Sequence, residues 1–138
     1  MNKQTPLPNG WQELVQSARE VRNHAYAPYS KFFVGAALRM TNGRIYRGCN
    51  VENSSFGLTI CAERVAMSSA VAVGNTQPDV LCISLAGQPV PCGSCRQFLH
   101  EFNPELALLL DDCDTDAPPE CVSLMELLPR AFCLTGQD

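Results

Sequence analysis

Two short cysteine motifs, far apart in the chain, constrain the fold more than any other feature of the sequence. One is Cys61-Ala62-Glu63 and the other is Pro91-Cys92-Gly93-Ser94-Cys95. Each motif stands where a helical pattern is expected to begin, and the backbone N–H groups and dipole of a helix start favour the thiolate over the thiol. If the three sulfur atoms bind one metal ion, the fold must bring two helix starts together.

The cysteine pair at 92 and 95 has several interpretations when it is taken alone. It fits a redox dithiol, half of a zinc site or a chance pair. Cys61 supplies a third thiolate and Glu63 a carboxylate two residues further on. Three protein ligands with an open fourth position are typical of catalytic zinc, whereas structural zinc sites are closed by four ligands. A structural zinc module closed by Cys49 or Cys82 is the alternative, and in it Glu63 would be dispensable.

The eight cysteines need an explanation other than disulfide formation. A chain of 138 residues fits a single domain, residues 1–138, and buries about two thirds of its unfolded surface without cross-links. The sequence shows no secretory signal and no run of about 18 apolar residues, so we expect a cytoplasmic protein with no membrane partner. In that reducing compartment, cysteines serve more often as metal ligands, reactive thiols or small buried side chains.

The charge of the chain bears on its partners. Lys and Arg total 10 against 14 Asp and Glu, which gives a net charge of -4. Binding to a polyanion depends on clustered basic side chains that displace counterions from phosphates. We therefore expect no nucleic-acid partner.

The hydrophobic pattern predicts helices that alternate with strands. Helices are predicted at 11–26, 61–73 and 93–102, and a capping box formed by Ser123 and Glu126 predicts a short fourth one. Strands are predicted at 32–40, 45–51, 80–85 and 106–110, with an Asn42-Gly43 hairpin turn between the first two. The acidic segment 111–120 is interpreted as a surface connection. The sum is an α/β fold, a mixed sheet with helices on both faces.

The two cysteine motifs match the signature of zinc deaminases, in which His or Cys stands two residues before Glu and Pro-Cys-x-x-Cys follows. The whole chain resembles a small cytidine deaminase of the homotetrameric, three-cysteine type. The resemblance covers 26–32, 34–38, 48–53, 61–64, 91–97 and 126–129, together with Phe132. It implies a three-layer α/β/α cytidine-deaminase-like fold with a mixed five-stranded sheet flanked by helices.

The resemblance also implies an activity. This is the hydrolytic deamination of free cytidine and deoxycytidine to uridine and deoxyuridine, with release of ammonia, in pyrimidine salvage. Zn²⁺ held by Cys61, Cys92 and Cys95 is the implied cofactor, a nucleoside the implied substrate, and a homotetramer with sites at subunit interfaces the implied assembly. A deaminase of another cytosine-containing nucleoside, such as a nucleoside antibiotic, is an alternative, as is the structural zinc module.

Two charged residues beside Cys61 are candidates for roles in the reaction. Glu63 is the candidate proton carrier, from the attacking water to N3 of the pyrimidine and then to the departing ammonia. Without the family match it reads as a first-turn glutamate that complements the helix dipole. Arg64 is the candidate cation that offsets the charge of three thiolates on a divalent ion, and Arg96 is a second candidate.

The substrate contacts follow from the resemblance. Asn50 and Glu52 alternate along a predicted strand, so their side chains share a face. The resemblance implies that this pair binds the ribose 3'-OH and that Phe32 packs on the pyrimidine. It also assigns Ala62 to the substrate site and places Phe132 in a neighbouring subunit's site. Without the resemblance, Asn50 and Glu52 fit the solvated end of a strand. Phe32 would then be a core residue, and Phe132 an apolar residue of the C-terminal tail.

The chain departs from the family pattern in three places. Phe56 stands where many relatives have a tyrosine, the segment 86–90 is short with Val90 in place of a small polar residue, and the linker 111–120 is unusually acidic. None of these belongs to the metal motif. All of them are positions at which substrate preference or subunit packing could change.

Overall fold

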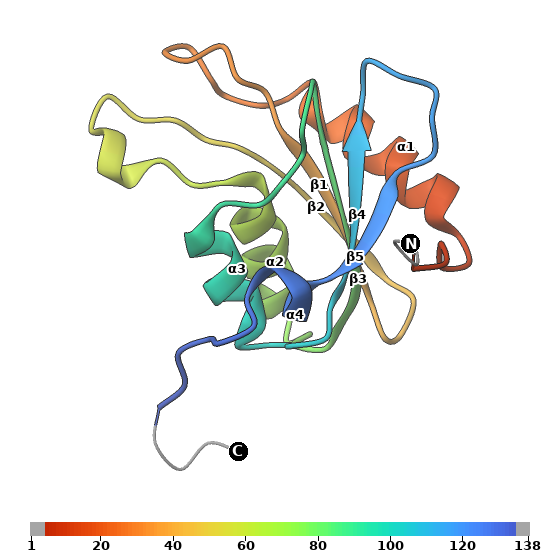
Figure 1. Ribbon diagram of the computed structural model, residues 1–138. Helices are drawn as coiled ribbons and strands as arrows, with labels where there is room; N and C mark the ends of the chain where they lie inside the picture. Colours follow the sequence, from red (N-terminus) through yellow and green to blue (C-terminus); the bar gives the residue numbers. More distant parts are fainter. Residues whose placement is uncertain (1–4, 135–138) are drawn as a thin grey trace.

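The structure, a computed structural model, describes residues 5–134 and is built on one five-stranded mixed sheet (Figure 1). The strands are β1 (Gly35–Met40), β2 (Ile45–Cys49), β3 (Pro78–Leu85), β4 (Ala107–Asp112) and β5 (Glu120–Ser123). Their order across the sheet is β2-β1-β3-β4-β5. Only β3 and β4 run parallel; the other neighbouring pairs are antiparallel. The mixed five-stranded sheet that we expected is thereby confirmed.

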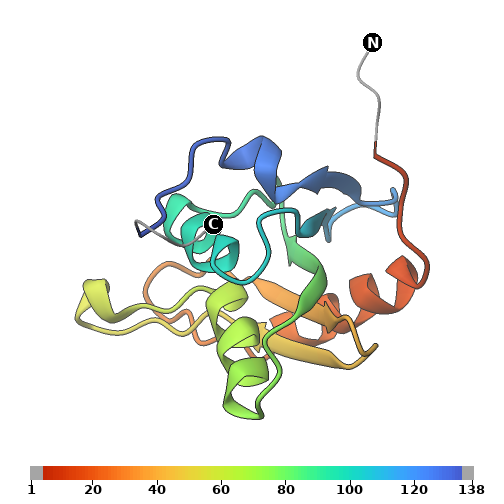
Figure 2. The same cartoon turned by 90° about the horizontal axis from the view of Figure 1, so that it is seen from below.

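Helices cover both faces of this sheet, which gives the three layers (Figure 2). One face is covered by α1 (Trp11–Arg22), and the other by α2 (Ala62–Ala72), α3 (Gly93–His100) and α4 (Leu124–Leu127). The core is divided in the same way, because alternate strand residues point to opposite faces. Ala37 and Cys82 pack with α1, whereas Leu38 and Leu81 pack with α2 and α3.

The glycine at position 48 lets α2 approach the sheet closely. A Cβ atom there would lie 2.4 Å from the backbone oxygen of Ala62 and 2.4 Å from the backbone nitrogen of Ala66. No larger residue fits without moving one of the two elements. The first turn of α2 is therefore held against β2, and this turn carries one of the two cysteine motifs.

Several element boundaries differ from those predicted from sequence. The first helix ends at Arg22 and not at 26, because Tyr26 donates a backbone hydrogen bond to Asn50 and pairs with Val51. The first strand begins at Gly35 and not at 32, because the side chain of Asn50 bonds the backbone of the residues before it. The capping box of Ser123 and the hairpin turn at Gly43, with φ of 86°, are confirmed.

The acidic segment 111–120 is only partly the surface connection that we expected. Its first two residues complete β4, and Asp111 has an exposed fraction of 0%. The segment's last residue, Glu120, begins β5, a short edge strand that no sequence pattern indicated. Among residues 5–134, no helix combines the length and the apolar composition that crossing a bilayer requires.

Candidate active site

The three cysteines of the two motifs meet at the starts of α2 and α3. Cys61 is the residue before α2, Cys92 is the residue before α3, and Cys95 lies in the first turn of α3. Their Sγ atoms all lie within 4.8 Å of one another, and those of Cys61 and Cys92 are 3.9 Å apart. A tetrahedral zinc ion with Zn–S bonds of about 2.3 Å places its sulfur ligands about 3.8 Å apart. The cluster therefore fits a zinc ion.

The cluster has three members and not four. Within residues 5–134 it is the only group of His, Cys, Asp or Glu side chains close enough to hold a metal ion. Cys82, which could have closed a structural site, packs in the core on the α1 side of the sheet, away from α2 and α3. The donor set thus leaves one coordination position of a zinc ion open, as in catalytic sites.

The surroundings of Cys61 favour its thiolate. The pKa of Cys61 is lowered to about 5, first by a hydrogen bond from Cys95 and then, against its burial, by hydrogen bonds from Arg64 and Cys92. The pKa of Cys95 is raised, because it shares its proton with Cys61 and is buried beside Glu63. Binding of a metal ion by all three sulfurs displaces the shared proton.

Arg64 and Arg96, the two candidate cations, lie in different places. Nη2 of Arg64 is 3.8 Å from Sγ of Cys61 and donates to the backbone oxygen of Thr59 at 3.3 Å. Arg96 donates to the backbone oxygens of Pro91 and Leu127, both at 2.9 Å. The guanidinium of Arg64 thus contacts a ligand sulfur, whereas the hydrogen bonds of Arg96 join the start of α3 to the end of α4.

Glu63 lies in the first turn of α2 with an exposed fraction of 4%. Burial raises the pKa of its carboxyl group, and the negative charge of Cys61 adds to the effect. Glu63 therefore holds a proton more readily than an ordinary carboxyl group does, which suits a residue that accepts and releases protons.

A cavity of about 220 Å³ opens beside the cysteines. Cys61, Cys92 and Glu63 form one part of its wall together with Ala62, and Phe32, Asn50 and Glu52 form another. Ile83 and Leu85, at the carboxyl end of β3, also line it, which is where open α/β sheets bind ligands. A wider hollow of about 550 Å³ lies by the β1–β2 turn, but no cysteine or acidic side chain lines it.

Asn50 and Glu52 line the cavity and also organise the loop that carries Phe32. Asn50 accepts a hydrogen bond from the backbone N–H of Val34 at 2.9 Å and donates to the backbone oxygen of Phe32 at 2.7 Å. Glu52 accepts from the backbone N–H groups of Tyr29 and Ser30 and from the hydroxyl of Ser30. These bonds, that of the hydroxyl foremost, lower the pKa of Glu52, so it is ionised at neutral pH.

Of the candidate substrate-binding residues, Phe132 is the one that does not line this cavity. Its backbone N–H and C=O groups both bond the side chain of Gln97, at 3.2 and 2.9 Å, and its ring is 70% exposed. The cavity wall also contains Gln88 and Thr59, which the sequence did not indicate, and Val90, which the sequence marked only as a departure from the family pattern. For Gln88 the only signal was the shortness of segment 86–90, which does not predict where a side chain points.

Comparisons with known proteins identify what the chain is similar to. Residues 9–109 match the family model described as the cytidine and deoxycytidylate deaminase zinc-binding region. The chain is 44% identical to a cytidine deaminase of Halalkalibacterium halodurans, over 92% of this chain and 96% of that protein. It is 41% identical to one of Sporosarcina psychrophila, over 88% and 90%. A crystal structure of cytidine deaminase from Burkholderia pseudomallei superposes with a TM-score of 0.83, at 39% identity, covering 91% of this chain and all of the other.

Proposed function

The chain belongs to the cytidine and deoxycytidylate deaminase family, and on this premise we propose that it hydrolyses free cytidine and deoxycytidine to uridine and deoxyuridine, with release of ammonia. The family activity is zinc-dependent hydrolytic deamination. The observation that carries the proposal is a cluster of three sulfur atoms within 4.8 Å of one another, two of which, those of Cys61 and Cys92, belong to residues that line the same cavity as the buried Glu63.

The metal would be held by Cys61, Cys92 and Cys95. A zinc ion with one open position lowers the pKa of a coordinated water to about 7, which supplies hydroxide at neutral pH. Three thiolates weaken this effect by their negative charge. Arg64, whose guanidinium lies 3.8 Å from the sulfur of Cys61, offsets part of that charge.

Glu63 would move the protons of the reaction. Its carboxylate accepts a proton from the attacking water as the new C–O bond forms at C4 of the pyrimidine. The resulting carboxylic acid delivers that proton to N3. Glu63 then takes the remaining proton from the hydroxyl group on C4 and passes it to the amino group, which leaves as ammonia as its bond to C4 breaks and the C4 carbonyl forms. General acid–base catalysis of this kind contributes about 10²- to 10⁴-fold in rate.

The sugar would be recognised by Asn50 and Glu52, and the base by Phe32 and Ala62. The carboxylate of Glu52 is ionised and accepts hydrogen bonds, so a ribose hydroxyl can donate to it. The 3'-OH is present in both sugars, which is why both nucleosides are proposed substrates. Because the same two side chains hold the loop of Phe32, the ring and the sugar contacts are fixed relative to each other.

A panel of cytosine compounds tests the proposed function. We expect ammonia release from cytidine and deoxycytidine, and much slower release from free cytosine, which lacks the sugar that Asn50 and Glu52 bind. The measurement is enzymatic detection of ammonia together with the ultraviolet change of the base. Turnover of a nucleoside antibiotic without turnover of cytidine would favour the alternative substrate. Release from none of the compounds by the zinc-loaded protein would reject the enzyme function.

The assembly that we propose is a homotetramer in which Phe132 reaches a neighbouring subunit's site, in the cytoplasm, where the free thiols stay reduced. Its support is the exposure of large apolar side chains: Phe132 is 70% exposed and Phe56 75% exposed. Phe56 lies in the short helix η1 (Phe56–Leu58), on a segment that projects from the body in both views (Figures 1 and 2).

Sedimentation velocity at micromolar concentration tests this assembly. We expect a species of four times the 15.1 kDa mass of one chain. We also expect Phe132→Ala to raise the KM for cytidine while the zinc content is unchanged, because a ring from the neighbour would be missing from each site. A stable monomer with full activity would contradict the proposed role of Phe132.

A further inference from the structure

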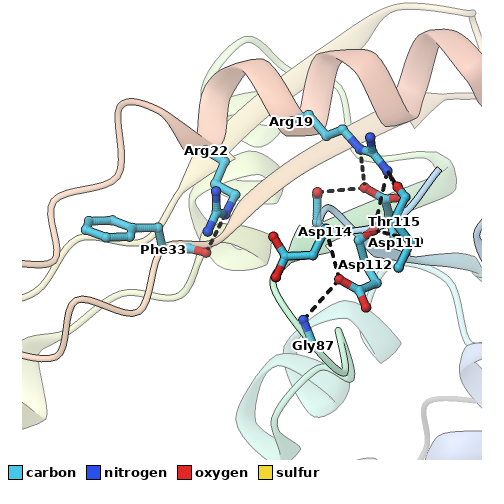
Figure 3. A network of polar contacts seen from close by, with 9 residues as sticks. Arg19, Arg22, Phe33, Gly87, Asp111, Asp112, Asp114 and Thr115 are labelled. Atoms are coloured by element: carbon cyan, nitrogen blue, oxygen red, sulfur yellow. Dashed lines mark hydrogen bonds and ion pairs between the residues drawn. The ribbon is translucent and has the colours of Figure 1, made fainter.

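The last turn of α1 is joined to the loop before β1 and to the loop after β4 (Figure 3). Nε of Arg22 donates to the backbone oxygen of Phe33 at 2.9 Å, next to Phe32 in the cavity wall. Arg19, one turn earlier, binds both carboxylate oxygens of Asp111 at 2.8 Å and the backbone oxygen of Thr115 at 3.0 Å. Neither arginine lines the cavity itself.

Asp111 is the residue that Arg19 binds most closely. Its side chain is fully buried at the carboxyl end of β4, and it also accepts a hydrogen bond from the hydroxyl of Ser84 in β3 at 2.7 Å. A buried carboxylate needs such partners to remain charged. The hydrogen bonds that Arg19 donates to Asp111 raise the pKa of Arg19, in keeping with a tight ion pair. The ends of β3 and β4 and the start of the acidic linker are thereby held together.

Asp112, the next residue, extends this arrangement to the short segment 86–90. Its Oδ1 accepts hydrogen bonds from the backbone N–H of Gly87 at 3.1 Å and from that of Asp114 at 3.0 Å. Gly87 has φ of 105°, a turn conformation that other residues rarely adopt. Among residues 5–134, the contact with Gly87 is the only hydrogen bond that joins segment 86–90 to another element.

The residues that follow this turn form part of the cavity wall. Gln88 and Val90 both line the cavity, and the backbone N–H of Val90 donates to the oxygen of Gln88 at 2.9 Å. Cys92, a candidate zinc ligand, comes two residues later. Because the segment is short and has one anchor, the position of Gln88 depends on the carboxylate of Asp112.

We propose that Asp112 is a positioning residue of the deamination site, which holds the Gly87 turn and so sets the Gln88 wall against the bound nucleoside. This inference rests on the proposed function. Asp112 acts through its capacity to accept the hydrogen bond of Gly87 and not through contact with substrate, since it does not line the cavity. The short segment 86–90 and the acidic linker 111–120, which both depart from the family pattern, thereby act together, because the linker supplies the hydrogen-bond acceptor that holds the segment.

Steady-state kinetics on the zinc-loaded protein tests this role with three variants. Asp112→Ala removes the acceptor, and we expect the KM for cytidine to rise about fivefold or more, with kcat and zinc content within about twofold of wild type. Asp112→Asn keeps an acceptor oxygen in the same place, and we expect a KM near that of wild type. Asp114→Ala is the matched control, because it removes an acid from the same linker whose side chain holds no part of segment 86–90.

Gln88→Ala shows whether Asp112 acts through this wall. We expect Gln88→Ala alone to raise the KM, and the double variant with Asp112→Ala to be no worse than the poorer single one, because both changes remove the same contact. Additive effects of the two changes on KM would overturn the inference. Equal KM values for Asp112→Ala and Asp114→Ala would also overturn it, as would a KM for Asp112→Asn as high as that for Asp112→Ala. If Asp112→Ala does not fold, an unchanged KM in Gln88→Ala is by itself enough to overturn the inference. Lack of turnover by wild type would instead reject the proposed function, and this inference with it.

Discussion

We expect Glu63→Gln to lower kcat for cytidine by about 10²- to 10⁴-fold or more, with the zinc content of wild type. The amide has nearly the shape of the carboxyl group, so it still fills the buried position in α2. It cannot accept a proton from water, and both proton transfers to the pyrimidine depend on that step. The measurement is the ultraviolet change that accompanies loss of the amino group, with metal analysis on the same sample.

The fold is not expected to suffer in this variant. Burial raises the pKa of Glu63, which means that the folded state disfavours its charged form, and this lowers stability as the pH rises above the carboxyl's ordinary value. Glutamine carries no such cost, so its unfolding temperature at pH 8 should equal or exceed that of wild type. Loss of activity would then reflect lost chemistry and not lost structure.

A matched control separates proton transfer from helix electrostatics. Glu13 also lies in the first turn of a helix, α1, so Glu13→Gln removes the same charge from a helix start away from the site. We expect that variant to retain wild-type kcat. Unaltered turnover in a zinc-loaded Glu63→Gln protein would contradict the proton-transfer role.

Removal of one sulfur ligand has the second large effect. In Cys61→Ala we expect the zinc content to fall from one ion per chain to a small fraction, and deamination to fall with it, because two thiolates hold zinc far less tightly than three. Zinc binds the folded chain, so the variant should also unfold at a lower temperature. Plasma emission spectrometry and a thermal melt measure these two effects.

Two comparisons make the ligand prediction specific. Cys133→Ser changes an exposed thiol outside the cluster and should keep both zinc and activity. In the wild type, zinc should be lost as the pH falls, because protons compete with the metal ion for the three sulfurs. A Cys61→Ala protein with full zinc and full turnover would show that this sulfur is not a ligand.

Much of the site could be predicted because its cysteines and its glutamate lie in short sequence motifs. Cys61 and Cys92 each stand at a helix start, and helix starts follow from hydrophobic periodicity over a few residues. The nearness of the two starts follows once three thiolates are assigned to one ion. The hairpin turn at Gly43 and the capping box at Ser123 are equally local, and both are present in the structure.

The parts that sequence did not indicate depend on contacts between distant residues. Asp111 belongs to an acidic run that composition assigns to solvent, yet it is buried because Arg19, 92 residues away, pairs with it. The first helix ends at Arg22 because Tyr26 pairs with Val51, 25 residues further along the chain. Gln88 lines the cavity because Asp112 holds the turn before it. No local pattern in the sequence contains any of these partners.

Zinc K-edge X-ray absorption on the wild-type, zinc-loaded protein tests the central claim most directly. That claim is one ion held by the sulfurs of Cys61, Cys92 and Cys95, with a fourth position free of protein ligands. The expected spectrum contains three sulfur neighbours at about 2.3 Å and one oxygen at about 2.0 Å. Four sulfur neighbours, or a shell with fewer than three, would contradict it.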